Sequence, residues 1–281
     1  MSLRRHPAVA GQFYPNKSDA LMSSLRVSFL HKHGPGELPP LPPSTKPIYG
    51  LISPHAGYVY SGPVAAHGYR AISALNDIDL FVILGPNHWG IGSAVATVRG
   101  GVWETPLGEV KVDSDAANEL VEECDIVEFD EEAHAREHSI EVQIPFLQFV
   151  FRNEFRILPI SMALQDRITS EEIGMALCGV VKKRKAMLIA SSDLTHYEPH
   201  DLASDRDKEL LKASQSLDVD MHYEILRKME ITACGYGPMA AVMTASRSLG
   251  GTQAKLLKYS TSGEIGGDYS SVVGYASLLI T

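Results

Sequence analysis

The chain has 281 residues, 44% of them hydrophobic and 21% charged, and carries a formal net charge of −9. This length suffices for one large α/β domain or two small ones. The acidic balance argues against nucleic-acid binding, because the phosphate backbone attracts clustered lysine and arginine. Three cysteines do not make a disulfide framework, the N-terminus lacks a signal-peptide core, and no apolar run reaches the ~18 residues of a membrane span. We therefore expect a cytoplasmic protein that does not contact a membrane.

The N-terminal part of the chain predicts one strand, one helix and a loop before the first buried strand. Residues 8–14 predict a short edge strand, and residues 18–30 a helix, because apolar residues recur there at intervals of four. Residues 33–47 are rich in proline and glycine and predict an exposed loop. The apolar run 48–52 predicts a buried strand that ends at Ser53-Pro54, because proline cannot donate to a sheet. A helix is expected from Gly62 onwards.

Three apolar runs are each followed closely by a histidine. Residues 48–52 precede His55, residues 80–84 precede His88, and residues 186–190 precede the pair Asp193 and His196. Ligands of open α/β sheets bind outside the carboxyl ends of parallel strands. The spacing of His55 and His88 is about one βαβ unit. We therefore expect the first two strands to be neighbours in a parallel sheet, with both histidines at one edge.

The rest of the chain alternates between predicted strands and helices, and no second domain boundary is evident. A turn-rich connection is expected over 100–108, a cap at Ser114 or Asp115, and a capping box over 169–172. Strands are predicted at 94–98, 110–112, 155–160, 254–260 and 271–280, and helices at 114–123, 140–151, 173–181, 201–215, 219–229 and 239–248. The pattern predicts a single α/β domain, residues 1–281.

Cys234 is the cysteine with chemical potential. It lies in the turn Ala-Cys-Gly-Tyr-Gly-Pro just before a predicted helix, where backbone amides favour the thiolate that binds metals or attacks substrates. Cys124 and Cys178 lie on predicted helices and are expected to be structural. A small packed cysteine is the alternative for Cys234.

Asp193 and His196 are three residues apart at a strand exit. An aspartate can orient a histidine and raise its basicity, as general-base catalysis requires. The alternative is that Asp193 only caps the turn that follows.

Residues 134–138 match H-x-x-E-H, the inverted zinc-peptidase pattern. The motif needs one continuous helix, but acidic residues precede His134 and Pro145 follows closely. No third ligand can be assigned. We therefore place His134 outside the site and expect His138 to be a polar residue that lines the pocket and contacts substrate.

Six ordered motifs together resemble the Memo family, named for mediator of receptor-driven cell motility. They are RHPAVAGQFYP, SPHAGYVYSGPVAAHGY, LGPNHWG, EHSIEVQIPFLQ, SSDLTHY and CGYGP, and they extend over nearly the whole chain. The resemblance implies a fold like that of the class III extradiol dioxygenases, non-haem iron enzymes that open catechol rings. That fold is a central, largely parallel mixed sheet flanked by helices. Archaeal and bacterial members resemble companions of an AMMECR-type protein and a radical SAM protein, which are the implied partners.

The resemblance also implies a site. The residues at the family's metal positions are His55, His88 and Cys234, while Asp193 and His196 match pocket residues, His196 at the place of the dioxygenase base. Ring-cleaving enzymes use two histidines and a carboxylate. Because a thiolate is softer, it shifts preference towards Cu(I), zinc or another iron chemistry, and puts catechol cleavage in question.

The leading hypothesis is therefore metal-dependent oxidation of a small molecule, with His196, oriented by Asp193, as general base. The expected cofactor is a divalent metal, iron first and copper or zinc as alternatives. A second hypothesis is a non-enzymatic module that holds a peptide or partner protein in the same pocket. A third is a hydrolase with Cys234 as nucleophile and His196 as base.

Overall fold

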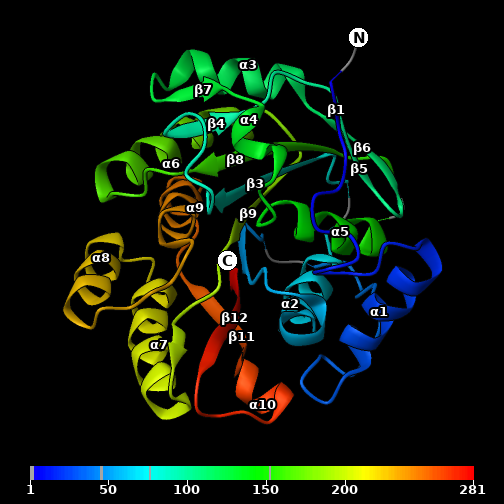
Figure 1. Cartoon of the computed structure of the whole chain (residues 1–281). Coiled ribbons are helices and arrows are strands. Elements are labelled where there is room, and N and C mark those ends of the chain that lie inside the picture. The colour runs from blue at the N-terminus through cyan, green and yellow to red at the C-terminus, as the bar shows by residue number, and fades with distance from the viewer. Residues whose placement is uncertain (1–2, 45–46, 76, 152) are drawn as a thin grey trace.

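The computed structural model describes residues 3–44, 47–75, 77–151 and 153–281 (Figure 1). These residues form twelve strands, which are β1 (Arg4–Arg5), β2 (Gly50–Ser53), β3 (Leu80–Pro86), β4 (Val95–Thr97), β5 (Val102–Thr105), β6 (Gly108–Val112), β7 (Val127–Phe129), β8 (Arg156–Met162), β9 (Ala186–Ser191), β10 (His196–Glu198), β11 (Ala254–Thr261) and β12 (Val272–Ile280).

Helices connect most of these strands. In the described part of the chain they are α1 (Ser18–Leu30), α2 (Tyr58–Ile72), α3 (Ser114–Glu123), α4 (Glu132–Ala135), a 3₁₀ turn η1 (Glu141–Gln143), α5 (Ile144–Val150), α6 (Arg167–Lys182), α7 (His200–Gln215), α8 (Val219–Lys228), α9 (Tyr236–Ser248) and α10 (Ser262–Gly266). No helix of the described residues is long and apolar enough to cross a bilayer.

The strands form one mixed sheet. Its order is β1-β5-β6-β8-β3-β9-β2-β12-β10, with β11 beside β12 and β4 beside β7 and β8. The central strands β6, β8, β3, β9 and β2 are parallel, while β12 runs antiparallel to β2. The predicted α/β fold with a largely parallel mixed sheet is confirmed.

The prediction that β2 and β3 are neighbours is wrong, because β9 lies between them and pairs with both. The crossover through α2 skips one position in the sheet, and a strand from much later in the chain fills it. Because β2, β9 and β3 are parallel, their carboxyl ends still meet at one edge. The three histidine-bearing ends are therefore closer in space than their sequence order implies.

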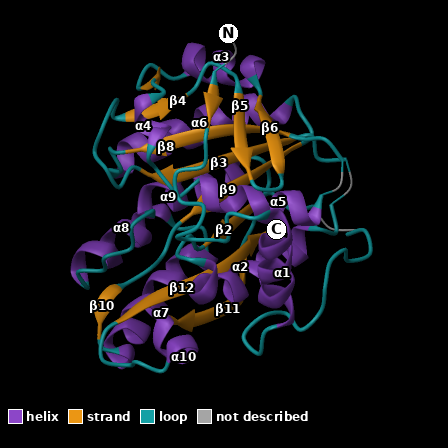
Figure 2. Ribbon diagram, turned by 45° about the vertical axis from the view of Figure 1, so that its right-hand side comes forward, coloured by secondary structure: helices purple, strands orange, loops and turns teal. Residues whose placement is uncertain are grey.

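Helices cover both faces of the sheet (Figure 2). Along β3 the side chains alternate: Leu80, Val82 and Leu84 pack with α3, α6 and α9, whereas Phe81 and Ile83 pack with α1, α2 and α5. All seven residues of β3 are buried. A strand buried on both faces reads as a continuous apolar run, which explains why the central strands are so clear in the sequence.

The edge-strand prediction for residues 8–14 is wrong. This segment forms turns, with one bridge between Ala10 and Tyr14. The buried carboxylate of Glu141 accepts hydrogen bonds from the amides of Ala8 and Val9 and from the Tyr14 hydroxyl, so these groups are satisfied without a sheet. Conversely, the expected connection over 100–108 contains β5, which pairs with β1 and β6.

Helix starts were the least accurate predictions. Helix α2 begins at Tyr58, four residues early, and α9 at Tyr236, three residues early. Asp113, one residue before the predicted caps, accepts the Ala116 amide at 2.9 Å, and Asp166 caps α6 three residues before the predicted box. An aspartate that accepts the amide three residues on is a strong N-cap.

The described part of the 33–47 loop contains no helix or strand; residues 45 and 46 lie outside the described residues.

The end of β3 depends on Gly85. A Cβ added there would lie 2.3 Å from Ser139 Oγ and 3.0 Å from Ser139 Cβ. We expect Gly85→Ala to lower the free energy of unfolding by about 1–3 kcal/mol, since a buried site that cannot expand is overpacked. Urea unfolding followed by circular dichroism measures this. Gly266→Ala is the control, because its Cβ would lie 3.4 Å from Tyr60 Cε1, an ordinary contact; equal stability of the two variants would contradict the prediction.

Candidate metal centre

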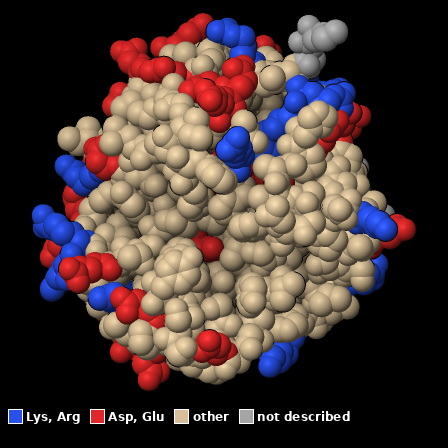
Figure 3. All heavy atoms as spheres, viewed as in Figure 1, with Lys and Arg blue, Asp and Glu red and all other residues tan. Residues whose placement is uncertain are grey.

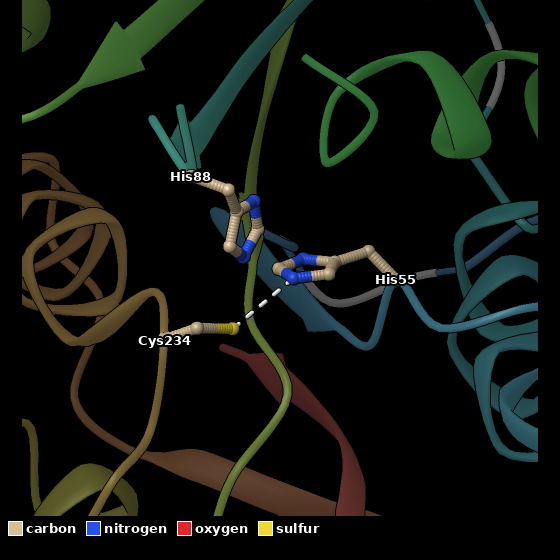
Figure 4. Close-up of side chains that lie close together, drawn as sticks. All are labelled: His55, His88 and Cys234. Carbon is tan, nitrogen blue, oxygen red and sulfur yellow. Dashed lines mark hydrogen bonds between the residues drawn. The ribbon is translucent and has the colours of Figure 1, made fainter. Parts of the chain in front are cut away.

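Three side chains from separate parts of the chain converge above the carboxyl edge of the sheet. His55 follows β2, His88 follows β3, and Cys234 lies in the loop that leads into α9 (Figure 4). One ligand atom from each residue lies within 4.8 Å of the others, and Cys234 Sγ is 3.1 Å from His55 Nε2. The structure thus brings together the three residues that the family resemblance implies as metal ligands.

The hydrogen bonds around Ser191 determine the tautomer of His55. The Ser191 hydroxyl donates its one proton to the carbonyl of Ser139, at 2.6 Å. Its oxygen must therefore accept from His55 Nδ1, at 2.9 Å, and from Gln143 Nε2, at 2.7 Å. The proton of His55 is then on Nδ1, and Nε2 presents its lone pair towards Cys234. Burial, followed by the positive charge of neighbouring histidines, lowers the pKa of His55 well below its usual value and keeps the ring neutral.

His88 is oriented in the same way by Glu137. Its Nδ1 lies 2.9 Å from Glu137 Oε1, and its backbone amide donates to Glu137 Oε2 at 2.6 Å. The carboxylate also accepts the amides of His138 and Ser139. Burial alone would raise the pKa of Glu137, but the hydrogen bond and charge of His88 hold it at about 2. An ionised Glu137 accepts the Nδ1 proton and leaves His88 Nε2 free to bind a metal.

Cys234 is held in place by its loop. Its Sγ accepts the amide of Asp193 at 3.3 Å, and Gly235 lets the loop approach the sheet, since a Cβ there would lie 2.3 Å from Ser191 O. Burial, with the nearby charge of Asp193, raises the pKa of the Cys234 thiol. In the metal-free protein, burial therefore outweighs the helix N-terminus, contrary to the expected thiolate. A metal would displace the thiol proton.

No described hydrogen bond joins Asp193 to His196, so the orienting role of Asp193 stays a prediction. Asp193 Oδ1 accepts the backbone amide of His55 at 2.8 Å, and burial raises its pKa to about 6. The described hydrogen bonds of His196 go instead to Thr232: Nδ1 donates to its carbonyl at 2.9 Å, and the backbone amide donates to its hydroxyl.

A cavity of about 580 Å³ adjoins the three convergent side chains. His196 and His138 both line it, as the sequence predicted. The His138 ring centroid lies 4.6 Å from that of His88 and 4.5 Å from that of Phe13. Burial lowers the pKa of His138 to about 4, so its ring is neutral near neutral pH.

The zinc-peptidase hypothesis is wrong. Helix α4 ends at Ala135, so His134 and His138 do not share one helical face. His134 is buried, lies against Trp103, and has its Nε2 3.1 Å from the carbonyl of Ala96. The glutamate of the motif, Glu137, accepts hydrogen bonds from His88 instead.

The segment that carries Glu137 is fixed by Arg5. The buried guanidinium donates to the carbonyls of His134 and Glu137, each at 2.7 Å, and to the carboxylate of Glu141 at 2.8 Å. It also stacks over the ring of Trp103, 4.2 Å from the centroid. An irregular segment without helix or sheet hydrogen bonds is thus held rigid by one buried charge pair.

The sequence reasoning missed three supporting residues: Glu137, Gln143 and Ser191. Each is a buried polar residue that hydrogen-bonds to a neighbour at the site. Buried polar side chains are hydrogen-bonded almost without exception, so such residues deserve to be read as support for a nearby site.

Comparison with known proteins places the chain among close relatives. A family described as "Memo-like protein" matches residues 5–279. The chain is 46% identical to a MEMO1 family protein of Methanopyrus kandleri, covering 99% of both chains, and 47% identical to one of Methanocaldococcus jannaschii, covering 100% of both. Its fold is similar to the crystal structure of an uncharacterised protein from Escherichia coli K12, with a TM-score of 0.58 and 16% identity, over 84% of this chain and 100% of that one.

Glu137→Gln tests the role of the carboxylate beside His88. The amide keeps the shape but weakens the acceptor for Nδ1, so we expect metal affinity to fall about 10–100-fold. Isothermal titration with zinc measures it. Glu132→Gln, at an exposed position of α4, is the matched control and should bind like the wild type. Equal affinities of Glu137→Gln and wild type would remove Glu137 from the site.

His134→Ala separates the site from the peptidase motif and gives a pH signature. We expect unchanged metal affinity. Burial lowers the pKa of His134 from 6.5 to about 4, so its neutral form stabilises the fold above pH 6.5, and this contribution is lost as pH falls towards 4. Stability measured by urea unfolding should therefore fall less in the variant across that window, by about 3 kcal/mol. Loss of metal binding in His134→Ala would revive the peptidase motif.

Proposed function

This chain belongs to the Memo family, and we propose that it binds a redox-active metal ion through His55, His88 and Cys234 and uses it to oxidise a small molecule in the adjoining cavity. The observation that carries the proposal is the pair of hydrogen bonds made by Nδ1 of His55 and Nδ1 of His88. Ser191 and Glu137 each accept a hydrogen bond from one Nδ1, so both imidazoles turn Nε2 towards Cys234 (Figure 4). Neutral imidazole is the commonest metal ligand among side chains.

The donor atoms fit a metal ion. Once the thiol has lost its proton, the sulfur and the two Nε2 atoms each direct a lone pair to the same point. A bound cation would remove the repulsion among these lone pairs. Two nitrogens and one thiolate suit iron, copper or zinc far better than magnesium or calcium. Iron is our first candidate because of the resemblance to the extradiol dioxygenases. When bound, such a metal supplies Lewis-acid and one-electron chemistry at the floor of the cavity.

The protein's own contribution to the reaction is a base whose ring is held in one orientation. Because His196 Nδ1 donates a hydrogen bond to the Thr232 carbonyl, Nε2 is the nitrogen that can accept a proton from a molecule in the cavity. His138 and Phe13 form a wall of stacked rings beside His88 that would position this molecule. AMMECR-type and radical SAM proteins remain proposed partners.

The hydrolase hypothesis gains one observation, the 3.1 Å approach of His55 to the Cys234 sulfur. Burial raises the pKa of the thiol and lowers that of His55, so the pair stays neutral, and a neutral thiol is a poor nucleophile. This favours ligation over attack.

Metal analysis of protein purified without oxygen tests the proposal. We expect stoichiometric metal in the wild type, a large loss in Cys234→Ser, and better retention of Fe(II) in Cys234→Asp than in Cys234→Ser, because a carboxylate restores the facial triad. Cys178→Ser on α6 is the control and should bind like the wild type. No metal in the wild type under any condition would contradict the proposal.

Alkylation of Cys234 by iodoacetamide gives an independent result. Metal bound at the sulfur should protect Cys234 strongly, whereas Cys178 should react alike with and without metal. Rapid labelling that saturating metal does not slow would favour the hydrolase.

A further inference from the structure

Tyr197 adopts a backbone conformation that bulky residues avoid. Its φ is 61°, in the left-handed region, and its side chain is 79% exposed. For a residue with a large side chain this conformation costs free energy, and burial of the ring does not repay it. Strained residues of this kind cluster at ligand sites. The strain therefore points to a role for the ring outside the folded core.

A bulge in β10 produces this conformation. His196 pairs with Val273 and Glu198 with Val272, so Tyr197 is the extra residue between two ladder positions. Bulges beside active sites re-aim a side chain. Here Tyr197 joins His196 and Val273 in lining the cavity, and its ring lies edge-on to that of His196, with centroids 5.7 Å apart.

No permanently charged cation lines the described part of the cavity. The described residues that line it include no lysine or arginine. Its one acidic residue, Asp193, is buried and already accepts the amide of His55. On the face shown in Figure 3, Lys, Arg, Asp and Glu lie mainly around the margin, and few of them lie near the centre. An anionic ligand would therefore lose its hydration without gaining a lysine or arginine as partner.

We propose that the cavity binds an uncharged, flat and largely apolar molecule, and that Tyr197 contacts it and sets this preference. Phe13, His138 and Tyr197 supply aromatic faces, and the volume of about 580 Å³ suits a small organic molecule. The proposal specifies the substrate class of the proposed oxidation and rests on it for biological meaning. Binding itself requires no metal.

Three matched probes test the ligand class in metal-free protein. They are 2-naphthol, which is flat and neutral; 2-naphthoate, which is flat and anionic; and decahydro-2-naphthol, which is neutral but not flat. Calorimetry and NMR shifts of the histidine rings measure affinity and place the probe. We expect 2-naphthol to bind at least tenfold more tightly than either of the others. Equal or tighter binding of 2-naphthoate would overturn the charge argument.

Variants of Tyr197 test the residue. Tyr197→Asn removes the ring and relieves the strain, because asparagine tolerates the left-handed region. We expect 2-naphthol affinity to fall about 2–10-fold, the size of an aromatic pair, while the urea midpoint stays or rises. Tyr197→Phe should bind like the wild type. A merely structural role would lower stability instead.

Tyr269→Asn is the control, since that tyrosine is also exposed, at 50%, but packs against His200 outside the cavity lining. It should leave 2-naphthol affinity unchanged. Wild-type affinity in Tyr197→Asn would overturn the role of Tyr197. Because these measurements use metal-free protein, their failure is distinct from failure of metal binding, which the metal analysis reports separately.

Discussion

The single hydroxyl proton of Ser191 decides which nitrogen of His55 can act as a ligand. Because that proton goes to the Ser139 carbonyl, the oxygen has only lone pairs to offer His55 and Gln143. The same logic recurs at His88, where Glu137 accepts, and at His196, where Thr232 accepts. Three histidines thus turn Nε2 towards one cavity because three groups accept hydrogen bonds from their Nδ1 atoms. The chemistry of the site follows from where these acceptors lie.

The sheet order places the acceptors. Ser191 ends β9, which lies between β2 and β3, so it is within reach of the residue that follows β2. Glu137 comes from an irregular segment that Arg5 holds against the ends of the strands. A site whose ligands follow two strands that are not adjacent therefore depends on the strand between them. Supporting groups of this kind orient the metal ligands and tune the bound metal.

The sequence predicted the central strands and the shared edge of His55 and His88 for physical reasons, whereas Cys234 joined the set through the family resemblance. Strands buried on both faces leave continuous apolar runs, and parallel strands bring their carboxyl ends together whatever their order. It failed where buried polar groups decide the structure. Glu141 satisfies amides that would otherwise form a strand at residues 8–14, and Asp113 and Asp166 cap helices earlier than predicted. Thr232 is 36 positions from His196, and such a pairing leaves no local signal.

X-ray absorption spectroscopy of the zinc-loaded protein shows directly whether Cys234 and the two histidines bind the metal. We expect one sulfur scatterer at about 2.3 Å and nitrogen scatterers at about 2.0–2.1 Å, with the outer-shell pattern of imidazole. A first shell of oxygen and nitrogen alone, without sulfur, would show that Cys234 does not bind the metal, and would contradict the account.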